Sequence, residues 1–283
     1  MSTCFFATDL HGHTERYEKL FRAVQARSPR AVFLGGDLMP HFSLSQGAPA
    51  DFLGDFVGPR LEALRSAMGS RYPTIFVILG NDDYRVDEEA VLEVQKRGLW
   101  EYAHFRRTEL EGYPVYGYAF VPPTPFLLKD WEKYDVSRYT PPGSVSPEEG
   151  RRSVRVDRRE VRHATIWNDL QQLAGGDDLT GAILLFHSPP NETNLDRAAL
   201  DGKMIDHVPL DLHVGSIAVR RFIEMKQPLI TLHGHIHEST RLTGSWHDRI
   251  GRTFMVNGSH DGEELSLITF DPGEPENTTR ELL

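Results

Sequence analysis

A carboxylate and an imidazole follow directly after an apolar run near the start of this sequence. Asp9 and His11 come after the run 5–8, which has the character of a buried strand. Side chains alternate faces in an extended chain, so we expect Asp9 and His11 to project the same way and to bind one metal ion. A short Asp-x-His match is common, however, and a hydrogen-bonded strand end would also explain it. The rest of the chain has to decide between these interpretations.

Four further apolar runs end at the same kinds of side chain. The runs cover 31–34, 74–79, 182–186 and 228–232, and the side chains that follow them are Asp37, Asn81, Asp82, Asp83, His187, His233, His235 and His237. Where strands alternate with helices, ligands bind beyond the carboxyl ends of the strands, because the loops converge there. We therefore expect these side chains to meet at one edge of a sheet.

Helical patterns separate the apolar runs. Apolar periodicity and helix start and stop signals predict helices over 14–27, 61–68, 88–97 and 157–174, and one more after Ser216. Ser216 is the expected N-cap of that last helix, whose N-terminus could also bind an anion. A strand, a helix and a second strand in succession predict parallel strands.

The remaining segments predict further strands and loops. Aromatic-rich segments at 100–109 and 114–120 predict an antiparallel pair, and two later strands are expected at 253–256 and 265–270. The segment 39–58 is rich in Gly, Pro and Phe and is expected to be a packed loop that carries His41. The polar, acidic tail 272–283 is expected to fray.

Two long connectors interrupt the pattern at 121–150 and 191–212. Prolines exclude a regular helix or a central strand from 121–150, while its aromatic residues indicate that it packs. This connector either caps the site or covers an ordinary surface. The candidate ligands spread over most of the chain, so we expect a single domain over 1–283 with the two connectors as loop insertions.

Composition excludes several classes of protein. The only cysteine is Cys4, so disulfides within the chain and thiolate metal sites are not expected. No segment approaches the roughly 20 apolar residues that span a bilayer, and no signal-peptide pattern is present, which favours a cytoplasmic protein. The net charge of −10 disfavours nucleic acid and membrane surfaces as partners. An arginine cluster over 151–159 is either a solvated charged face or a phosphate contact.

The candidate ligands are oxygen and imidazole groups without thiolates. Such donors suit divalent ions of intermediate hardness, such as Mn, Fe, Zn, Co or Ni. The candidates are too numerous for one ion. Seven residues with one bridging carboxylate would hold two ions about 3.5–4 Å apart, a separation used in phosphoryl displacement.

The ordered motifs resemble a known superfamily. Asp9-Leu10-His11, Gly36-Asp37, Gly80-Asn81, His187 and Gly234-His235-Ile236-His237 resemble the signature of the calcineurin-like metallophosphoesterases. The resemblance implies an α/β fold, a four-layer α/β/β/α sandwich of two mixed sheets flanked by helices. It also implies a dinuclear metal centre at the strand ends.

The same resemblance implies a role for each ligand. One ion would be bound by Asp9, His11 and His237, the other by Asn81, His187 and His235, with Asp37 bridging them. A hydroxide between the ions would attack the phosphorus of a small phosphorylated substrate. His13, His41, His213, His233 and His260 match no ligand position and are expected to be structural.

The sequence departs from the superfamily pattern at one position. Many members have a histidine after Gly-Asn, which assists the leaving group or contacts the phosphate, whereas this chain has Asp82. An ionised Asp82 would repel a phosphate dianion, which slightly favours phosphodiesters. Asp83 fits the acidic position that follows and would orient a metal-bound or proton-transferring histidine. Asp82 and Asp83 are thus the candidate catalytic residues, either behind the ligands or on the leaving-group side.

Other functions remain open on the same site. These are a phosphomonoesterase, a phosphoprotein phosphatase, a nuclease supported only by the arginine cluster, and a metal-binding scaffold without catalysis, of which Asp82 would be the sign. Retention of all seven ligand types argues against the scaffold.

Overall fold

Two six-stranded sheets form the centre of the molecule. The structure, a computed structural model, describes residues 3–40 and 51–283. The first sheet has the order β14 (Thr279–Leu282), β13 (Ser266–Phe270), β1 (Cys4–Ala7), β2 (Ala31–Gly35), β3 (Thr74–Ile78) and β4 (Glu101–Tyr102). The second has the order β11 (His247–Ile250), β12 (Thr253–Asn257), β10 (Ile230–His233), β7 (Ile183–Phe186), β6 (Tyr113–Tyr118) and β5 (Arg106–Leu110). Both sheets mix parallel and antiparallel pairs.

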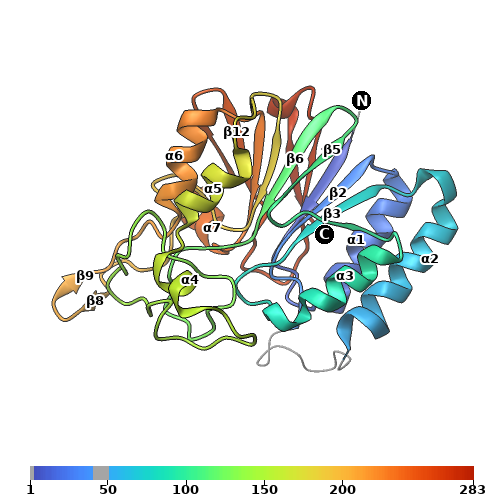
Figure 1. The fold of residues 1–283 in the computed structure, drawn as a ribbon. Coiled ribbons are helices and arrows are strands. Elements are labelled where there is room, and N and C mark those ends of the chain that lie inside the picture. The colour runs from blue at the N-terminus through green and yellow to red at the C-terminus, as the bar shows by residue number, and fades with distance from the viewer. Residues whose placement is uncertain (1–2, 41–50) are drawn as a thin grey trace.

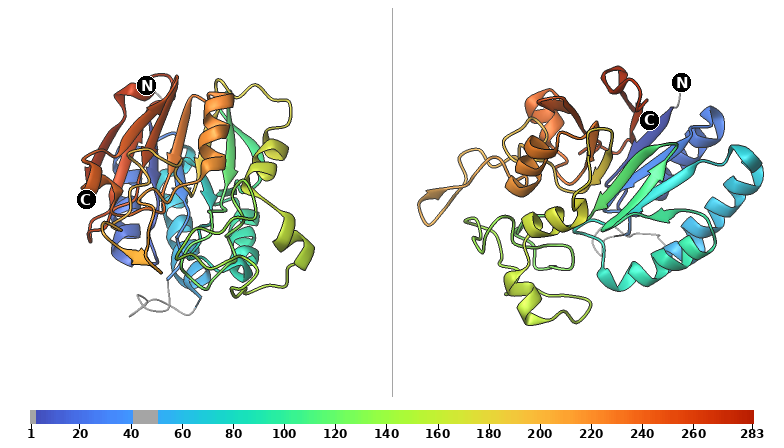
Figure 2. Two further views of the ribbon diagram at one scale, coloured as in Figure 1. Left: turned by 90° about the vertical axis from the view of Figure 1, so that its left-hand side faces the viewer. Right: turned by 45° about the horizontal axis from the view of Figure 1, so that its top comes forward.

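Helices cover the outer face of each sheet. The first sheet carries α1 (Thr14–Arg27), α2 (Gly58–Met68) and α3 (Glu88–Lys96), and the second carries α5 (Ile166–Ala174) and α6 (Ile217–Lys226) (Figure 1). Figure 2 shows the same layering from two further sides. Two short helices, α4 (Arg158–His163) and α7 (Ser239–Thr243), lie in connections. The predicted fold of two mixed sheets flanked by helices is therefore confirmed.

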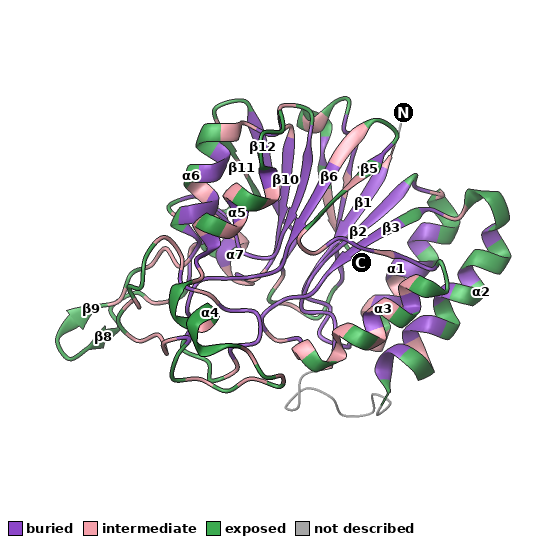
Figure 3. Ribbon diagram, in the orientation of Figure 1, coloured by how far each residue is buried: buried purple, intermediate pink, exposed green. Residues whose placement is uncertain are grey.

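The strands that lead to the candidate ligands are buried on both faces. All four residues of β1 are fully buried, and Figure 3 shows the same for the central strands of both sheets. The rings of Phe33 on β2 and Phe76 on β3 stack with their centroids 5.1 Å apart. Strands buried on both faces have continuous apolar sequences, which is why the sequence showed apolar runs rather than alternation.

The predicted helices over 14–27 and 88–97 are confirmed closely, whereas the helix predicted over 157–174 is wrong as one element. The chain is extended at Ala164 and Thr165, which separate α4 from α5. The Thr165 side chain accepts a hydrogen bond from the Asn168 N–H and caps α5. The Ile166 N–H donates to the Tyr134 carbonyl, so the connector takes the backbone bond that a continuous helix would have used.

Two other expectations need correction. The tail expected to fray instead forms β14, which pairs antiparallel with β13, while Glu281 forms an ion pair with Arg27. The loop expected over 39–58 is helical from the π-helix Leu53–Val57 onwards, where Phe52 and Phe56 stack 5.2 Å apart. Residues 41–50 of that segment, His41 among them, lie outside the described residues.

The segment 100–109, which was expected to pair with 114–120, contributes strands to both sheets. Its second half, β5, pairs antiparallel with β6 as predicted. Its first half, β4, pairs parallel with β3 in the first sheet. The Ala103 N–H donates to the Val77 carbonyl and extends that pairing before the chain crosses to the second sheet.

The proline-rich connector is held together by a buried ion pair. The Lys129 ammonium lies 2.5 Å from the Glu132 carboxylate, and both side chains are almost fully buried. Glu132 also accepts hydrogen bonds from the backbone and hydroxyl of Thr124. In the view of Figure 1 this connector lies below the sheets, beside α4.

Two aspartates attach the connector to the rest of the fold. Asp130 accepts a hydrogen bond from the Arg85 N–H, in the 3₁₀ turn Arg85–Asp87 that follows Asn81 and Asp82. Asp135 accepts from the Ser216 hydroxyl at 2.5 Å and from the Ile217 N–H at 2.7 Å. The predicted N-cap at Ser216 is confirmed, and the anion at that helix terminus is a carboxylate of the same chain.

The second connector carries a hairpin away from the sheets. Strands β8 (Met204–Ile205) and β9 (Val208–Pro209) form it. Two further 3₁₀ turns, Gly69–Arg71 and Pro275–Asn277, complete the elements. Among residues 3–40 and 51–283, no helix is both long and apolar enough to traverse a lipid bilayer.

Candidate metal centre

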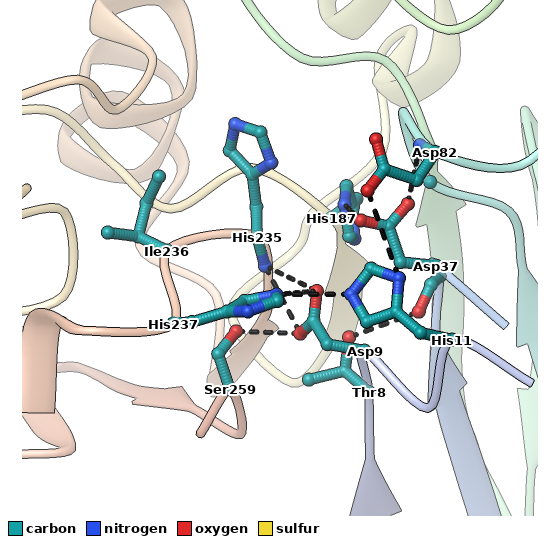
Figure 4. Close-up of polar contacts among 12 residues, drawn as sticks. Thr8, Asp9, His11, Asp37, Asp82, His187, His235, Ile236, His237 and Ser259 are labelled. Atoms are coloured by element: carbon teal, nitrogen blue, oxygen red, sulfur yellow. Dashed lines mark hydrogen bonds and ion pairs between the residues drawn. The ribbon is translucent and has the colours of Figure 1, made fainter. Parts of the chain in front are cut away.

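The carboxyl ends of strands from both sheets bring the candidate ligands together (Figure 4). Strands β1, β2 and β3 run parallel in one sheet, and β7 and β10 run parallel in the other. Ligand atoms of Asp9, His11 and His237 lie within 4.8 Å of one another, as do those of Asp37, His187 and His235. The Asn81 Oδ1 lies 3.1 Å from the His187 Nε2. All seven predicted ligands therefore lie in one region.

Four of these residues adopt a left-handed backbone conformation that residues other than glycine rarely take. The φ angles are 55° at Asp9, 46° at His11, 51° at Asp37 and 73° at His235. Residues in this left-handed region cluster at functional sites, where the surrounding structure fixes them. The expectation that Asp9 and His11 meet through strand alternation is wrong in its reason, because β1 ends at Ala7 and the turn after it aims both side chains.

The first group surrounds the Asp9 carboxylate. The His11 Nε2 lies 3.2 Å from the His237 Nε2, which lies 3.3 Å from the Asp9 Oδ1. The Asp9 Oδ2 accepts a hydrogen bond of 2.6 Å from the buried Ser259 hydroxyl. Sequence reasoning missed Ser259, although it follows the apolar run of β12 as the other site residues follow theirs.

The second group surrounds His187. Its Nε2 lies 3.2 Å from the Asp37 Oδ2, and its Nδ1 lies 2.8 Å from the Gly35 carbonyl oxygen. A carbonyl only accepts, so the Nδ1–H donates, and the Nε2, which faces Asp37 and Asn81, is the nitrogen that could bind a cation in place of a proton. The ring of His235 stands beside that of His187, with the centroids 5.2 Å apart.

Burial at this site disfavours the charged form of each side chain. At two positions, however, pairing with an opposite charge outweighs burial and shifts the pKa the other way. Burial would lower the pKa of His187, but the Asp37 carboxylate raises it to about 10. Burial would raise the pKa of Asp9, yet His237 brings it below its ordinary value. Burial lowers the pKa of His235 to about 3 and keeps that imidazole neutral. The groups compensate one another's charge, so a cation that binds His187 must displace its proton.

Two glycines in the motifs make room for the ligands. A Cβ at Gly80 would lie 2.3 Å from the Asp37 Oδ1, and one at Gly234 would lie 2.7 Å from the Asp9 Oδ2. Neither approach is possible without displacing a carboxylate. The glycine before Asn81 and the glycine before His235 are therefore required by the packing of the site.

Asp82 and Asp83 occupy different environments. The buried Asp83 carboxylate accepts hydrogen bonds from the backbone N–H groups of Leu38, Met39 and Gly80 at 2.8–2.9 Å. These contacts join the loop after β2 to the loop after β3. The expected role of Asp83 in orienting a histidine stays a prediction. Burial and the Asp37 carboxylate raise the pKa of Asp82 to about 7, and cations bound nearby would lower it again.

The histidines without a ligand position in the motifs have other contacts. The buried His233 Nδ1–H donates to the Ser188 carbonyl, and its Nε2 lies 2.7 Å from the Thr231 hydroxyl. His213 pairs with Asp196, and His260 pairs with Glu264. His13 precedes α1 as its N-terminal flanking residue.

Comparison with known proteins agrees with this geometry. The family model described as calcineurin-like phosphoesterase matches residues 3–239. The chain belongs to the calcineurin-like phosphoesterase family. No curated protein matches the chain by sequence.

Solved structures show the same fold as this calcineurin-like phosphoesterase. One is similar with a TM-score of 0.61 at 16% identity, with 99% of this chain and 98% of that chain covered. The protein TT1561 of Thermus thermophilus is similar with a TM-score of 0.56 at 17% identity, over 99% and 98% of the two chains. An archaeal phosphodiesterase aligns at 9% identity over 99% of both chains, with a TM-score of 0.46. At these identities the first two structures show the fold alone, and nothing is concluded from the third.

The residues of this calcineurin-like phosphoesterase fit divalent cations. Carboxylate, amide and imidazole donors are the types that such ions accept in proteins. The His187 Nε2 faces oxygens of Asn81 and Asp37, as a ligand atom of a shared cation would. The Nε2 atoms of His11 and His237 likewise converge, at 3.2 Å from each other. Among the residues that the structure describes, the buried His11 Nδ1 has no hydrogen-bond partner.

Proposed function

We propose that this chain hydrolyses a phosphate ester of a small molecule, with two divalent metal ions held by the seven side chains. The observation that carries the proposal is the convergence of two three-residue groups from strands of both sheets. A single structural cation would need only one of these groups.

The ligand groups divide the site into two halves. Asp9, His11 and His237 would hold one ion, and Asn81, His187 and His235 the other. Asp37 fits the position between them because its oxygens lie in a group with His187 and in a second group with His11. When bound, the ions would neutralise the charge of the phosphate and lower the pKa of bound water.

Neighbouring groups of the chain hold these ligands in place. The Ser259 hydroxyl and the His235 N–H bond to the Asp9 carboxylate, and the Asp82 N–H donates to the Asp37 Oδ1 at 2.8 Å. Such contacts fix the orientation of a ligand before a cation or substrate arrives. The site is thus preorganised by backbone and hydroxyl donors.

The charge of the chain limits the choice of substrate. A net charge of −10 disfavours nucleic acid as a substrate. The arginine cluster does not offset this charge, because the 230 Å³ cavity that Arg155 lines with Arg85 is also lined by Glu88, Asp157 and Glu160. The Asp82 carboxylate beside Asp37 favours a phosphodiester, which carries less negative charge than a monoester. We therefore place small phosphodiesters first, with phosphomonoesters as the alternative.

Hydrolysis of bis(p-nitrophenyl) phosphate by the Mn²⁺-loaded protein tests the proposal. Asp37→Ala and His187→Ala should each lower kcat/KM by about 100-fold or more, because each removes a ligand at the centre of the site. His163→Ala on the exposed face of α4 is the control and should leave the rate unchanged. Equal rates in all four proteins would refute the proposal.

A metal-binding scaffold without catalysis is the second candidate. Asp82 favours it, since the chain lacks the histidine that assists the leaving group in many superfamily members. Wild-type protein that binds Mn²⁺ but cleaves none of a panel of phosphate monoesters and diesters would support the scaffold.

A further inference from the structure

The His11 ring stands between the candidate metal centre and Asp82. Its Nε2 faces the His237 Nε2 at 3.2 Å, within the first ligand group. Its Nδ1 faces the Asp82 Oδ2 at 3.8 Å and, within 3–40 and 51–283, is buried without a hydrogen-bond partner (Figure 4). The His11 side chain is 6% exposed, so water does not readily reach this nitrogen.

The two ring nitrogens of a ligand histidine have opposite tasks. A neutral imidazole that gives its Nε2 lone pair to a cation carries its proton on Nδ1. Ligand histidines usually donate this proton to a carboxylate or a carbonyl, which fixes the ring and raises its basicity. The carboxylate that faces the His11 Nδ1 is that of Asp82.

We propose that Asp82 is a positioning residue, which accepts the Nδ1–H hydrogen bond of His11 when the first ligand group holds a cation. The inference rests on the metal centre of the proposed function. It gives Asp82 a task of its own in this chain, in place of the assistance to a leaving group that a histidine would give.

The contacts of Asp82 leave the required oxygen available. Its backbone N–H donates to the Asp37 Oδ1, and its Oδ1 accepts from the Asn81 Nδ2 at 3.0 Å. The Oδ2 is the oxygen turned towards His11. A small rotation of the carboxylate would shorten the separation from 3.8 Å to the length of about 2.9 Å typical of a hydrogen bond.

Direct ligation by Asp82 is the competing arrangement. Ligand atoms of His11, Asp37 and Asp82 also lie within 4.8 Å of one another. The His11 nitrogen that faces Asp82 is the Nδ1, which carries the proton once the Nε2 binds a cation with Asp9 and His237. The geometry therefore favours Asp82 as an acceptor.

Mn²⁺ affinity, measured without substrate from the electron paramagnetic resonance signal of the free ion, is the first test. Asp82→Ala should weaken binding about 10- to 100-fold, because the Nδ1–H loses its acceptor. Asp82→Asn keeps a carbonyl oxygen that can accept, so it should lose less than about tenfold. Asp87→Ala, in the turn Arg85–Asp87, is the matched control and should bind as the wild type does.

A second readout follows the proton itself. In Zn²⁺-loaded protein labelled with ¹⁵N-histidine, the His11 Nδ1–H should give a slowly exchanging resonance in the wild type and in Asp82→Asn, and should lose it in Asp82→Ala. His187 supplies an internal control, because its Nδ1–H donates to Gly35 in every variant.

The outcomes separate this inference from the proposed function. Unchanged affinity in Asp82→Ala would overturn the inference, and equal weakening in both Asp82 variants would make Asp82 a direct ligand and overturn it as well. Wild-type protein that binds no cation would overturn the metal centre and the inference together. Binding as expected without hydrolysis of any ester would refute only the proposed function.

Discussion

Asp82 is the residue at which this chain departs from its superfamily, and its surroundings determine the chemical effect of the change. Its oxygens are turned towards Asn81 and His11, and its backbone N–H is bound to Asp37. The carboxylate is thus part of the structure that holds the ligands. A phosphate group that enters the site meets negative charge at this point rather than a proton donor.

Substitution of Asp82 by histidine should therefore change substrate preference. Asp82→His removes a negative charge and supplies a donor, so the ratio of monoester to diester kcat/KM should rise about tenfold or more. The rates on p-nitrophenyl phosphate and bis(p-nitrophenyl) phosphate measure this ratio. Asp87→His, in the turn Arg85–Asp87, is the control for the added imidazole, and an unchanged ratio in Asp82→His would remove the argument for diesters.

At the scale of elements, the connector that follows β6 owes its shape to one buried ion pair. Lys129 and Glu132 are 0% and 1% exposed and lie 2.5 Å apart, next to Thr124. Replacing one member leaves the other charge buried without a partner, which costs about 3–5 kcal/mol, whereas an apolar pair of similar volume is often tolerated. The pair thus fixes a segment without regular secondary structure.

Lys129→Met should destabilise the protein by about 3 kcal/mol, measured as the free energy of unfolding in urea. The double variant Lys129→Met with Glu132→Leu should recover most of that loss, because no charge is then left buried. A double variant as unstable as the single one would show that the ion pair itself is needed. A single variant within about 0.5 kcal/mol of the wild type would contradict the proposed role of the pair.

The elements also show how far the sequence could predict the structure. The helices α1 and α3 and the strands that lead to the ligands follow from apolar periodicity and apolar runs. The break between α4 and α5 could not be foreseen, because it depends on a hydrogen bond from Ile166 to the distant Tyr134. The polar tail becomes β14 only because β13 offers it an edge.

The candidate site was predictable in composition but not in geometry. Residue types at the ends of apolar runs indicated candidate ligands, since those ends meet in an α/β fold, and the resemblance to the superfamily selected seven of them. The left-handed conformations at Asp9 and Asp37 have no signal in the sequence, where glycine would be the ordinary choice. Ser259 was missed because a single serine after a strand does not suggest a carboxylate partner 250 residues away.

At the scale of the whole molecule, the partly enclosed His104 makes the free energy of unfolding depend on pH. The His104 ring packs against Trp131, with centroids 5.0 Å apart, and its Nδ1 accepts from the Ala119 N–H. Loss of hydration lowers the pKa of His104 to about 3, with Lys133 acting in the same direction. The unfolded chain binds a proton there near pH 6.5, so the folded state loses stability as the pH falls from about 6.5 towards 3.

Replacement of His104 by glutamine should make this pH dependence shallower. Between about pH 6 and 4, the free energy of unfolding of the wild type should fall more steeply than that of His104→Gln, by up to about 1.4 kcal/mol per pH unit. Urea unfolding at several pH values measures both slopes. His163→Gln at an exposed position is the control, and a slope equal to the wild type in His104→Gln would contradict the assignment.

At the scale of the whole molecule, the strand ends of two sheets meet at one place, and the proposed function requires that place to hold two cations. The number of Mn²⁺ ions bound per chain after equilibrium dialysis, measured by mass spectrometry of the metal, tests this most directly. We predict two ions in the wild type and fewer in Asp37→Asn. A wild-type protein that retains one ion or none at saturating Mn²⁺ would contradict the account.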